Sequence, residues 1–332
     1  MHRRRPGHRL DLGTRGLRVL VLGGTVFLGR HLVEAALAGG HEVTLFNRGR
    51  SDPGAFPDVE QVRGDREAGL GALGGRSWDW VVDTSGYLPR LVRQSVAAGL
   101  GRYCFFSSVS VYEGQGTLED SPRRSLADPA IEDVDQEYPG LKAACEDLLP
   151  ADSLVIRPGL IVGPDDPTER FTYWPLRIHR GGEVLGPGDP ERECQFIDVR
   201  DLAAFSLSLM QEGTAGSLNA VNEGVPMGEL LAGGEVTWVA DDFLLEHDVT
   251  PYTEMPLWIP PEWGRRVDTR RARASGLSPR PWRESWQATL QWALGRSGPP
   301  PTQDSGGRLR PPAESLSAER EAELLRLWHA RA

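Results

Sequence analysis

Short apolar runs alternate with segments of helical apolar spacing over the first half of the chain. The runs are typical of buried strands, and apolar residues three or four positions apart are typical of helices that cover a sheet. Predicted strands span residues 17–22, 42–46, 80–83, 103–107 and 154–156, and predicted helices span residues 29–37, 91–100 and 141–149. Because this alternation requires crossover connections, it predicts an α/β fold of the Rossmann type, a doubly wound parallel sheet.

The second half of the chain is less regular and richer in proline and tryptophan. Open α/β sheets bind ligands at the carboxyl ends of their strands, and we expect this smaller C-terminal region to lie over that edge. The predicted organisation is a flexible basic tail at 1–16, a Rossmann domain at 17–165 to which 194–222 returns, the smaller region at 166–193 and 223–295, and a linker with a C-terminal helix at 296–332.

Charge and composition exclude several classes of partner. The 332 residues carry a net charge of −10, whereas nucleic acid and anionic membranes attract a basic face. The three cysteines, Cys104, Cys145 and Cys194, form no C-x-x-C pair, and the histidines have no metal-ligand spacing. No apolar run is long enough to span a membrane, and residues 1–16 lack the apolar core of a signal peptide. We expect a cytoplasmic protein with no metal and with neither nucleic acid nor membrane as a partner.

A glycine-rich turn, Gly23-Gly24-Thr25-Val26-Phe27-Leu28-Gly29, follows the first predicted strand and opens the first predicted helix. Backbone N–H groups at a helix N-terminus point towards an anion, and the missing glycine side chains let a pyrophosphate approach. A tight turn without a ligand is the alternative. The strand-turn-helix context favours a dinucleotide, so residues 17–165 are the predicted dinucleotide-binding domain.

This turn resembles that of the short-chain dehydrogenase/reductase superfamily, in its extended and atypical branches, which include NAD-dependent epimerase/dehydratase-like proteins. The usual fingerprint is T-G-G-x-G-F-x-G, and Val26 replaces its middle glycine, where a Cβ would crowd or shift the diphosphate. Atypical members with a G-G-T-x-F-x-G turn tolerate a larger residue there. The resemblance implies cofactor contacts from Gly23, Thr25, Phe27, Leu28 and Gly29.

The end of the second predicted strand indicates which dinucleotide binds. An NAD site has Asp or Glu there for the ribose hydroxyls, and that carboxylate would repel a 2′-phosphate. This chain has Asn47 followed by Arg48, with Arg50 close by. Because an arginine side chain binds phosphate well, these residues predict NADP(H) as the cofactor, with NAD as the alternative. The alternative for Arg48 and Arg50 is that they are surface arginines without a ligand. The resemblance further implies that Asp65 contacts the adenine amine.

The only lysine of the chain, Lys142, stands four residues after Tyr138 in the stretch YPGLK, against thirty-six arginines elsewhere. If a helix begins near Tyr138, the two side chains share a face, and Pro139 is tolerated in its first turn. A nearby cation lowers the pKa of a phenol, which prepares it for proton transfer. A compact ammonium can also bind both nicotinamide-ribose hydroxyls, and a guanidinium differs in reach and shape. An exposed helix lysine is the alternative.

The superfamily's third catalytic residue is a serine or threonine upstream. The stretch from Phe105 to Tyr112 resembles the pattern S-S-x-x-V-Y, which implies that Ser108 hydrogen bonds the substrate oxygen. Ser107 and Ser110 are the competing choices. The stretch Ile156-Arg-Pro-Gly159 continues the resemblance and implies that Pro158 lies against the nicotinamide.

The substrate is less defined by the sequence. Extended-branch enzymes of nucleotide sugars hold the diphosphate with an Asn and an Arg, and Leu160 and Cys194 stand at those positions here, although Arg177 and Arg192 lie nearby. We predict substrate contacts in the smaller, substrate-binding region and in the loops at the sheet edge. The predicted residues are Tyr87, Tyr173, Trp174 and His179. Packing is the alternative role for each of them.

The leading hypothesis is an oxidoreductase that performs NADPH-linked carbonyl reduction or alcohol oxidation on a small molecule, using Ser108, Tyr138 and Lys142. One alternative is a nucleotide-sugar epimerase or dehydratase with bound NAD. The other is a non-catalytic dinucleotide-binding or RNA-binding relative. The resemblance also implies a homodimer formed through the helix that carries Tyr138 and Lys142.

Overall fold

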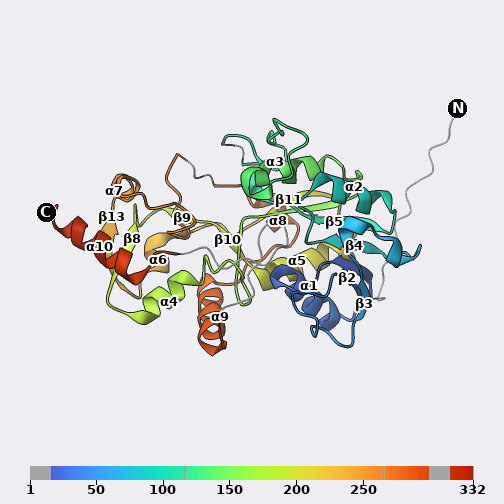
Figure 1. Ribbon diagram of the computed structural model, residues 1–332, viewed down its shortest axis with the longest axis horizontal. Helices are drawn as coiled ribbons and strands as arrows, with labels where there is room; N and C mark the ends of the chain where they lie inside the picture. The colour runs from blue at the N-terminus through green and yellow to red at the C-terminus, as the bar shows by residue number, and fades with distance from the viewer. Residues whose placement is uncertain (1–15, 116, 263, 265, 299–314, 332) are drawn as a thin grey trace.

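A seven-stranded parallel sheet forms the core of one half of the structure, at the right in Figure 1. The computed structural model describes residues 16–115, 117–262, 264, 266–298 and 315–331. In the spatial order β11-β6-β5-β4-β1-β2-β3, the strands are Gly216–Ala220, Leu154–Pro158, Arg102–Phe106, Trp80–Asp83, Arg18–Leu22, Glu42–Asn47 and Glu60–Arg63. Every neighbouring pair is parallel. The predicted Rossmann-type α/β fold is therefore confirmed.

Helices cover both faces of this sheet. Helices α1 (Phe27–Ala38) and α5 (Val199–Gln211) pack side by side on one face, and α2 (Pro89–Ala97) and α3 (Val134–Glu146) pack on the other (Figure 1). Strand β1 contributes Val19 and Val21 to one buried cluster and Leu20 and Leu22 to another. Burial on both faces explains why this strand has a continuous apolar run rather than an alternating one.

The direction of winding reverses between β1 and β4, which are neighbours at the centre of the sheet. The connection after β1 leads to α1 on one face, and the connection after β4 leads to α2 on the other. The loops that follow these two strands therefore separate at the carboxyl edge, which is where open α/β sheets bind ligands.

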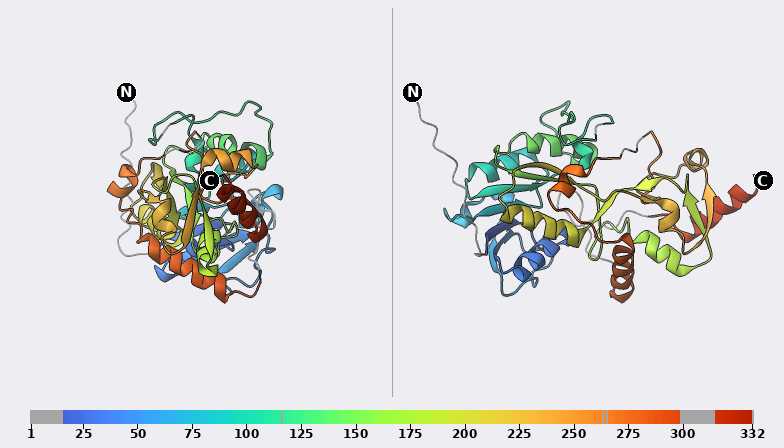
Figure 2. Two further views of the ribbon diagram at one scale, coloured as in Figure 1. Left: turned by 90° about the vertical axis from the view of Figure 1, so that its left-hand side faces the viewer. Right: turned by 180° about the vertical axis from the view of Figure 1, so that it is seen from behind.

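A second apolar cluster lies away from the sheet, around the parallel pair β8 (Glu183–Pro187) and β13 (Glu235–Val239). Helix α4 (Tyr173–Arg180) and helix α10 (Ala318–His329) contribute to it. The molecule is elongated, and α10 lies at the end opposite the seven-stranded sheet (Figure 2). The remaining elements are β7 (Leu160–Val162), β9 (Glu193–Cys194), β10 (Phe196–Asp198), β12 (Val225–Pro226), α6 (Met227–Leu230), α7 (Asp241–Glu246), α8 (Arg270–Ala274) and α9 (Trp282–Gly295), with short 3-10 turns at Arg66–Ala68, Gly71–Leu73 and Val109–Val111.

Three of the elements expected from the sequence can be compared with the structure. A C-terminal helix is present as α10, whereas the predicted tail and most of the predicted linker lie outside the described residues. The helix expected over 141–149 instead spans Val134–Glu146. No helix among the described residues is long and apolar enough to cross a membrane.

Candidate active site

The glycine turn between β1 and α1 requires its glycines. Gly23 and Gly24 have φ angles of 112° and 93°, which residues with a side chain rarely adopt. A Cβ on Gly29 would lie 2.8 Å from the Gly24 Cα, so the helix can approach the turn this closely only without a side chain. Val26 is extended and is the N-cap residue of α1. The turn thus brings the N-terminus of α1 to the carboxyl edge of the sheet.

The other predicted residues of this turn differ in how far their side chains are exposed. Leu28 is 9% exposed and its side chain belongs to the buried cluster under α1. Phe27 packs against that cluster and has a φ angle of 38°, a left-handed value that is unfavourable for a residue with a side chain. Thr25 is half-buried. Leu28 can therefore contribute only its backbone to a cofactor.

Polar groups meet at the end of β2. The Asn47 Oδ1 accepts a hydrogen bond from the backbone N–H of Gly49 at 2.9 Å and another from the Arg63 guanidinium. Arg63 is the last residue of β3 and pairs in register with Asn47. Arg48 is exposed on the same turn, and Arg50 is also exposed. Sequence reasoning missed Arg63, because its position depends on a short polar strand that the apolar pattern did not predict.

Asp65 follows β3 and is the N-cap residue of the short 3-10 turn at Arg66–Ala68. Its Oδ1 accepts a hydrogen bond from the Glu67 N–H at 3.0 Å. Its carboxylate is half-buried at the carboxyl edge of the sheet, which is the edge expected of an adenine contact.

Tyr138 and Lys142 share one helical segment. Helix α3 has a kink at Glu137, whose φ and ψ angles of −132° and 32° are not helical. The continuous helix resumes at Tyr138, which leaves Pro139 in its first turn, where the missing N–H and the fixed φ cost little. The local backbone is therefore the one that the YPGLK stretch predicts.

Lys142 is buried, with 3% of its surface exposed. Its Nζ donates hydrogen bonds to the carbonyl oxygens of Gly86 at 2.8 Å and Phe106 at 2.7 Å. The same Nζ lies 4.6 Å from the ring centroid of Tyr87 and 4.7 Å from that of Phe105. Burial lowers the pKa of Lys142 to about 8. Two backbone carbonyls thus hold the ammonium, and its third proton can serve a ligand.

Tyr138 lies against Tyr87, with 6.2 Å between the ring centroids, and is hydrogen bonded to the side chain of Ser108. Burial raises the pKa of the Tyr138 phenol, Tyr87 raises it further, and Ser108 opposes the shift. The direction is opposite to the one expected from the spacing of Tyr138 and Lys142 alone. The Lys142 Nζ is 5.9 Å from the Tyr138 ring centroid, and burial has the larger effect. Tyr138 is therefore protonated at neutral pH.

The serine cluster separates into different roles. The Ser108 Oγ accepts hydrogen bonds from the N–H and the hydroxyl of Ser110, at 3.1 and 2.9 Å, and Ser108 also bonds Tyr138. The Ser107 Oγ is buried and has no hydrogen-bond partner within the described chain. Of the three serines weighed from the sequence, Ser108 is the one bonded to the Tyr138 phenol.

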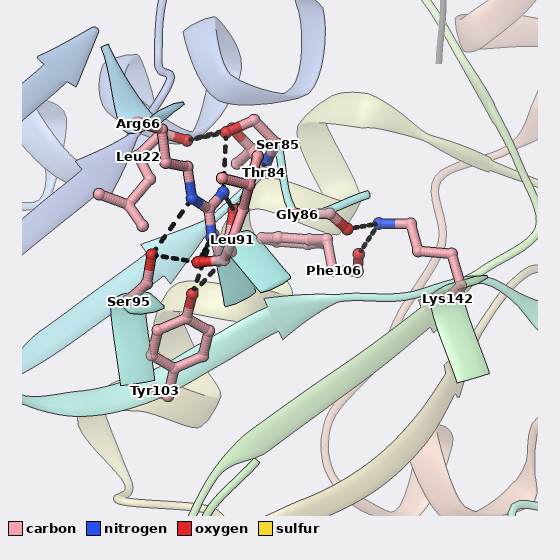
Figure 3. Close-up of polar contacts among 11 residues, drawn as sticks. Leu22, Arg66, Thr84, Ser85, Gly86, Leu91, Ser95, Tyr103, Phe106 and Lys142 are labelled. Atoms are coloured by element: carbon pink, nitrogen blue, oxygen red, sulfur yellow. Dashed lines mark hydrogen bonds and ion pairs between the residues drawn. The ribbon is translucent and has the colours of Figure 1, made fainter. Parts of the chain in front are cut away.

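Arg66 lies beside Thr84 and Ser85, close to the loop that holds Lys142 (Figure 3), and it forms a buried ion pair with Asp83. Asp83 ends β4, is fully buried, and accepts two hydrogen bonds from Arg66, at 2.8 and 2.5 Å, and one from the Tyr103 hydroxyl at 2.6 Å. Although burial alone would raise the pKa of Asp83, Arg66 holds it below its usual value. The Ser85 N–H also donates to Asp83, at 3.1 Å.

This network fixes the backbone that reaches Lys142. The hydroxyls of Thr84 and Ser85 both donate to the carbonyl of Leu22 at 3.1 Å, which ties the loop after β4 to the end of β1. The next residue, Gly86, supplies a carbonyl oxygen to Lys142 (Figure 3). Sequence reasoning missed Arg66 and Asp83, although a carboxylate that ends a wholly apolar strand is a sign of a buried partner.

The predicted substrate contacts are not all at this site. Tyr87 is beside Tyr138 and Lys142. Trp174 is fully buried in the cluster around β8 and donates its Nε1–H to the Pro256 carbonyl at 2.8 Å, whereas His179 is exposed on α4. Tyr173 packs on Trp174 and lines a cavity of about 330 Å³ with Arg177 and Arg180. Pro158 is buried at the end of β6.

The two arginines considered for a diphosphate are both paired. Arg192 donates to both carboxylate oxygens of Asp241, at 2.8 and 2.5 Å. Arg177 donates its Nε–H to Glu321 of α10, at 2.7 and 2.8 Å, in a pair whose side chains are at most 5% exposed. Leu160 and Cys194, in place of the expected Asn and Arg, are therefore not compensated by these two side chains.

Comparison with known proteins supports the fold and gives two distant sequence relatives. No family model matches the chain. The chain is 28% identical over 216 residues to the chloroplast stem-loop binding protein of 41 kDa b from Arabidopsis thaliana, covering 58% of this chain and 55% of that protein. The match thus spans about half the length of that relative. The chain is also 28% identical over 255 residues to a 2-alkyl-3-oxoalkanoate reductase from Stenotrophomonas maltophilia, covering 64% of this chain and 72% of the reductase.

Among solved structures, the Thermus thermophilus UDP-glucose 4-epimerase in complex with NAD superposes with a TM-score of 0.59 at 19% identity, covering 84% of this chain and 100% of that one. The chain has the fold of an NAD-binding epimerase. The resemblance to extended short-chain dehydrogenase/reductases is thereby confirmed at the level of the fold.

Proposed function

We propose that the chain is an NADPH-dependent reductase of small carbonyl compounds, with Tyr138 as the general acid. The observation that carries this proposal is the protonated Tyr138 phenol, hydrogen bonded to Ser108 and next to the buried ammonium of Lys142 at the carboxyl edge of the sheet. A phenol with a raised pKa holds its proton until an acceptor of higher basicity develops, as the oxygen of a carbonyl does during reduction.

The residues at this edge fit a nicotinamide dinucleotide. The turn at Gly23 and Gly24 leads directly into α1, and a Cβ at Gly29 would clash with the backbone of Gly24. Such a turn offers backbone N–H groups and a helix N-terminus to a pyrophosphate. A nicotinamide dinucleotide held there supplies the hydride that reduces a carbonyl carbon. Lys142 would bind the nicotinamide ribose with the proton that its two backbone partners leave available.

The end of β2 supports NADP(H) over NAD. Asn47 stands where an NAD site has an acid, and the Arg63 guanidinium bonds its side chain. Arg63 lies beside Gly49, where a Cβ would be 2.6 Å from its Nη1, and Arg48 is exposed on the same turn. Two arginines at this position attract a 2′-phosphate, and the lack of a carboxylate removes the usual repulsion.

The proton step follows from the contacts of Tyr138. A carbonyl oxygen that accepts hydrogen bonds from Tyr138 and Ser108 gains negative charge as its carbon accepts the hydride. The Tyr138 phenol then gives its proton to that oxygen, which completes the alcohol. The positive charge of Lys142 stabilises the resulting phenolate until solvent returns a proton.

The two alternatives have less support. A nucleotide-sugar epimerase or dehydratase needs cations for the substrate's diphosphate, and both Arg177 and Arg192 are held by carboxylates. A stem-loop binding role, suggested by the name of the Arabidopsis relative, conflicts with the net charge of −10 and with the assembled Ser108, Tyr138 and Lys142. The name of the second relative, an oxoalkanoate reductase, agrees with carbonyl reduction.

Cytoplasmic location and a homodimer are further parts of this proposal. The three cysteines are free thiols, as expected of a reducing compartment. The homodimer is supported by the family resemblance alone, with the helix α3 as its expected interface.

Two measurements test the proposed function. Titration with NADPH and NADH, followed by nicotinamide fluorescence, should show tighter binding of NADPH; tighter binding of NADH would refute the cofactor assignment. Neighbouring serines provide matched variants for the chemistry. Ser108→Ala should lose most of its carbonyl reduction, whereas Ser107→Ala, which removes a buried hydroxyl without a partner, should keep it. Equal activity of the two variants would remove Ser108 from the mechanism.

A further inference from the structure

One arginine near Tyr138 differs from the paired arginines of the substrate side. We propose that Arg170, supported by Tyr252, binds a carboxylate of the substrate, so that the substrate is an oxo acid. This inference rests on the proposed function, because it takes Tyr138 as the proton donor to the reacting carbonyl. It adds a binding residue and a substrate class to that function.

Arg170 and Tyr252 form a stacked pair. The Arg170 Cζ lies 4.6 Å from the ring centroid of Tyr252, and the phenol is hydrogen bonded to the guanidinium. The Arg170 Nε is buried and has no hydrogen-bond partner among the described residues. A guanidinium that stacks on a ring keeps its edge N–H groups available for the two oxygens of a carboxylate.

The Tyr252 ring is held in a defined position. The backbone φ angle of Tyr252 is 63°, a left-handed value that costs free energy for a residue with a side chain. Its backbone N–H donates to the carbonyls of Met255 at 3.1 Å and Trp258 at 3.0 Å, which stabilise this turn. The stacking surface for Arg170 is thus built before any ligand binds, and this reduces the cost of ordering the site.

This pair acts on the charge of the Tyr138 phenol. Burial, Tyr87 and Ser108 have the largest effects on the pKa of Tyr138. The next two groups are Tyr252, which raises this pKa, and Arg170, which lowers it. Arg170 comes from the segment between β7 and α4, and Tyr252 comes from the segment after α7, so both reach this point from the smaller region. In the proposed complex, the substrate would contact Tyr138 with one group and Arg170 with another.

Two carboxylates, Asp166 and Glu169, precede Arg170 in the chain. Asp166 is fully buried, and its Oδ1 accepts two hydrogen bonds from Thr168 at 2.8 Å, while its Oδ2 has no partner within the described chain. Burial raises the pKa of Asp166 to about 6, and the hydrogen bonds from Thr168 and the charge of Arg170 oppose this rise. Glu169 is paired with Arg296. No ion pair of Arg170 occurs among the described residues.

A carboxylate fits this environment better than a diphosphate. One stacked guanidinium matches the single charge and the two oxygens of a carboxylate. A diphosphate would need further cations, and Arg177 and Arg192 are already ion-paired with Glu321 and Asp241. In the reaction, the carbonyl carbon of the oxo acid gains the hydride of NADPH and its oxygen gains the Tyr138 proton. The products are the hydroxy acid and NADP⁺, and the carboxylate is unchanged.

The test compares an acid with its neutral ester in binding and in turnover. Binding of 3-hydroxyoctanoate and of its methyl ester to the saturated NADPH complex is measured by calorimetry for the wild type, Arg170→Met and Arg170→Lys. Turnover is measured with the corresponding oxo acid and ester. Arg93→Met, which changes an exposed arginine of α2, is the matched control.

We expect the wild type to bind the acid more tightly than the ester, and Arg170→Met to weaken the acid roughly 10- to 100-fold with little effect on the ester. Arg170→Lys should recover part of this loss, and Arg93→Met should bind as the wild type. The same affinity for acid and ester, no binding of either, or equal weakening of both by Arg170→Met would overturn the proposal. If Arg170→Met unfolds, Arg170→Lys alone decides, because an unchanged preference for the acid would also overturn it.

The failures of the two proposals are distinguishable. Binding of the acid that depends on Arg170, without any turnover, would contradict the reductase function and leave the carboxylate site standing. Turnover of acid and ester at equal efficiency would contradict the carboxylate site and leave the reductase function standing.

Discussion

Replacing Asp83 by Asn should destabilise the protein far more than the same change at an exposed ion pair. Asp83 is fully buried and holds Arg66 with two hydrogen bonds of 2.8 and 2.5 Å. Asn has the same shape but no charge, so the buried guanidinium loses its counter-charge. Breaking a buried pair by removing one partner costs about 3–5 kcal/mol in the free energy of unfolding.

Glu67 provides the matched control. It accepts two hydrogen bonds from Arg90, at 2.5 and 2.9 Å, but the side chains of this pair are 54% and 45% exposed. Because water solvates both charges, Glu67→Gln should cost no more than about 1 kcal/mol. The geometry of the two pairs is similar and their burial differs, and Arg90 also keeps a second carboxylate partner, Glu132.

The assay is urea unfolding followed by tryptophan fluorescence, with linear extrapolation to water. The expected result is a large drop in the unfolding midpoint for Asp83→Asn, a small one for Glu67→Gln, and unchanged slopes. Asp83 also supports the ammonium form of Lys142, so its loss should lower the pKa of that lysine below about 8. Equal stability losses in the two variants, or none in Asp83→Asn, would refute the role given to this network.

Three further predictions concern the site itself. Carbonyl reduction by the wild type should fall as the pH rises through about 8, because the buried Lys142 then loses its proton. A wild-type rate that does not change across this pH range would count against a role for the Lys142 ammonium. Lys142→Arg should lose most turnover while it keeps the melting temperature. Gly29→Ala should weaken NADPH binding, since its Cβ would lie 2.8 Å from the Gly24 Cα and displace the turn; calorimetry with unchanged affinity would show that the turn is not the cofactor site.

Five of the seven strands were predictable because they are buried on both faces and read as continuous apolar runs, whereas the two edge strands, β3 and β11, were not predicted. Strand β4 was predicted with its observed bounds, Trp80–Asp83. Strand β3 escaped prediction because its sequence, Glu-Gln-Val-Arg, lies at the sheet edge and is only partly buried. Missing it also meant missing Arg63, which reaches Asn47 only because β3 pairs with β2.

The shared position of the two proposed catalytic residues, Tyr138 and Lys142, was predictable because one helix carries both. The spacing of Tyr138 and Lys142 fixes their common face, but their pKa values depend on burial and on partners from other elements. The carbonyls of Gly86 and Phe106 that hold Lys142 come from two different loops, so no local pattern reveals them. Arg170 and Tyr252 are brought together from distant segments, and the sequence contains no motif for this pair.

Consumption of NADPH by the wild type and by Tyr138→Phe tests the central claim most directly. Both proteins are supplied with a medium-chain oxo acid after their affinity for NADPH has been shown to be equal by fluorescence. The wild type should oxidise NADPH and form the hydroxy acid, and Tyr138→Phe, which keeps the ring but has no proton to give, should be slower by roughly 10²–10⁴-fold. Equal rates in the two proteins would contradict the assignment of Tyr138 as the proton donor.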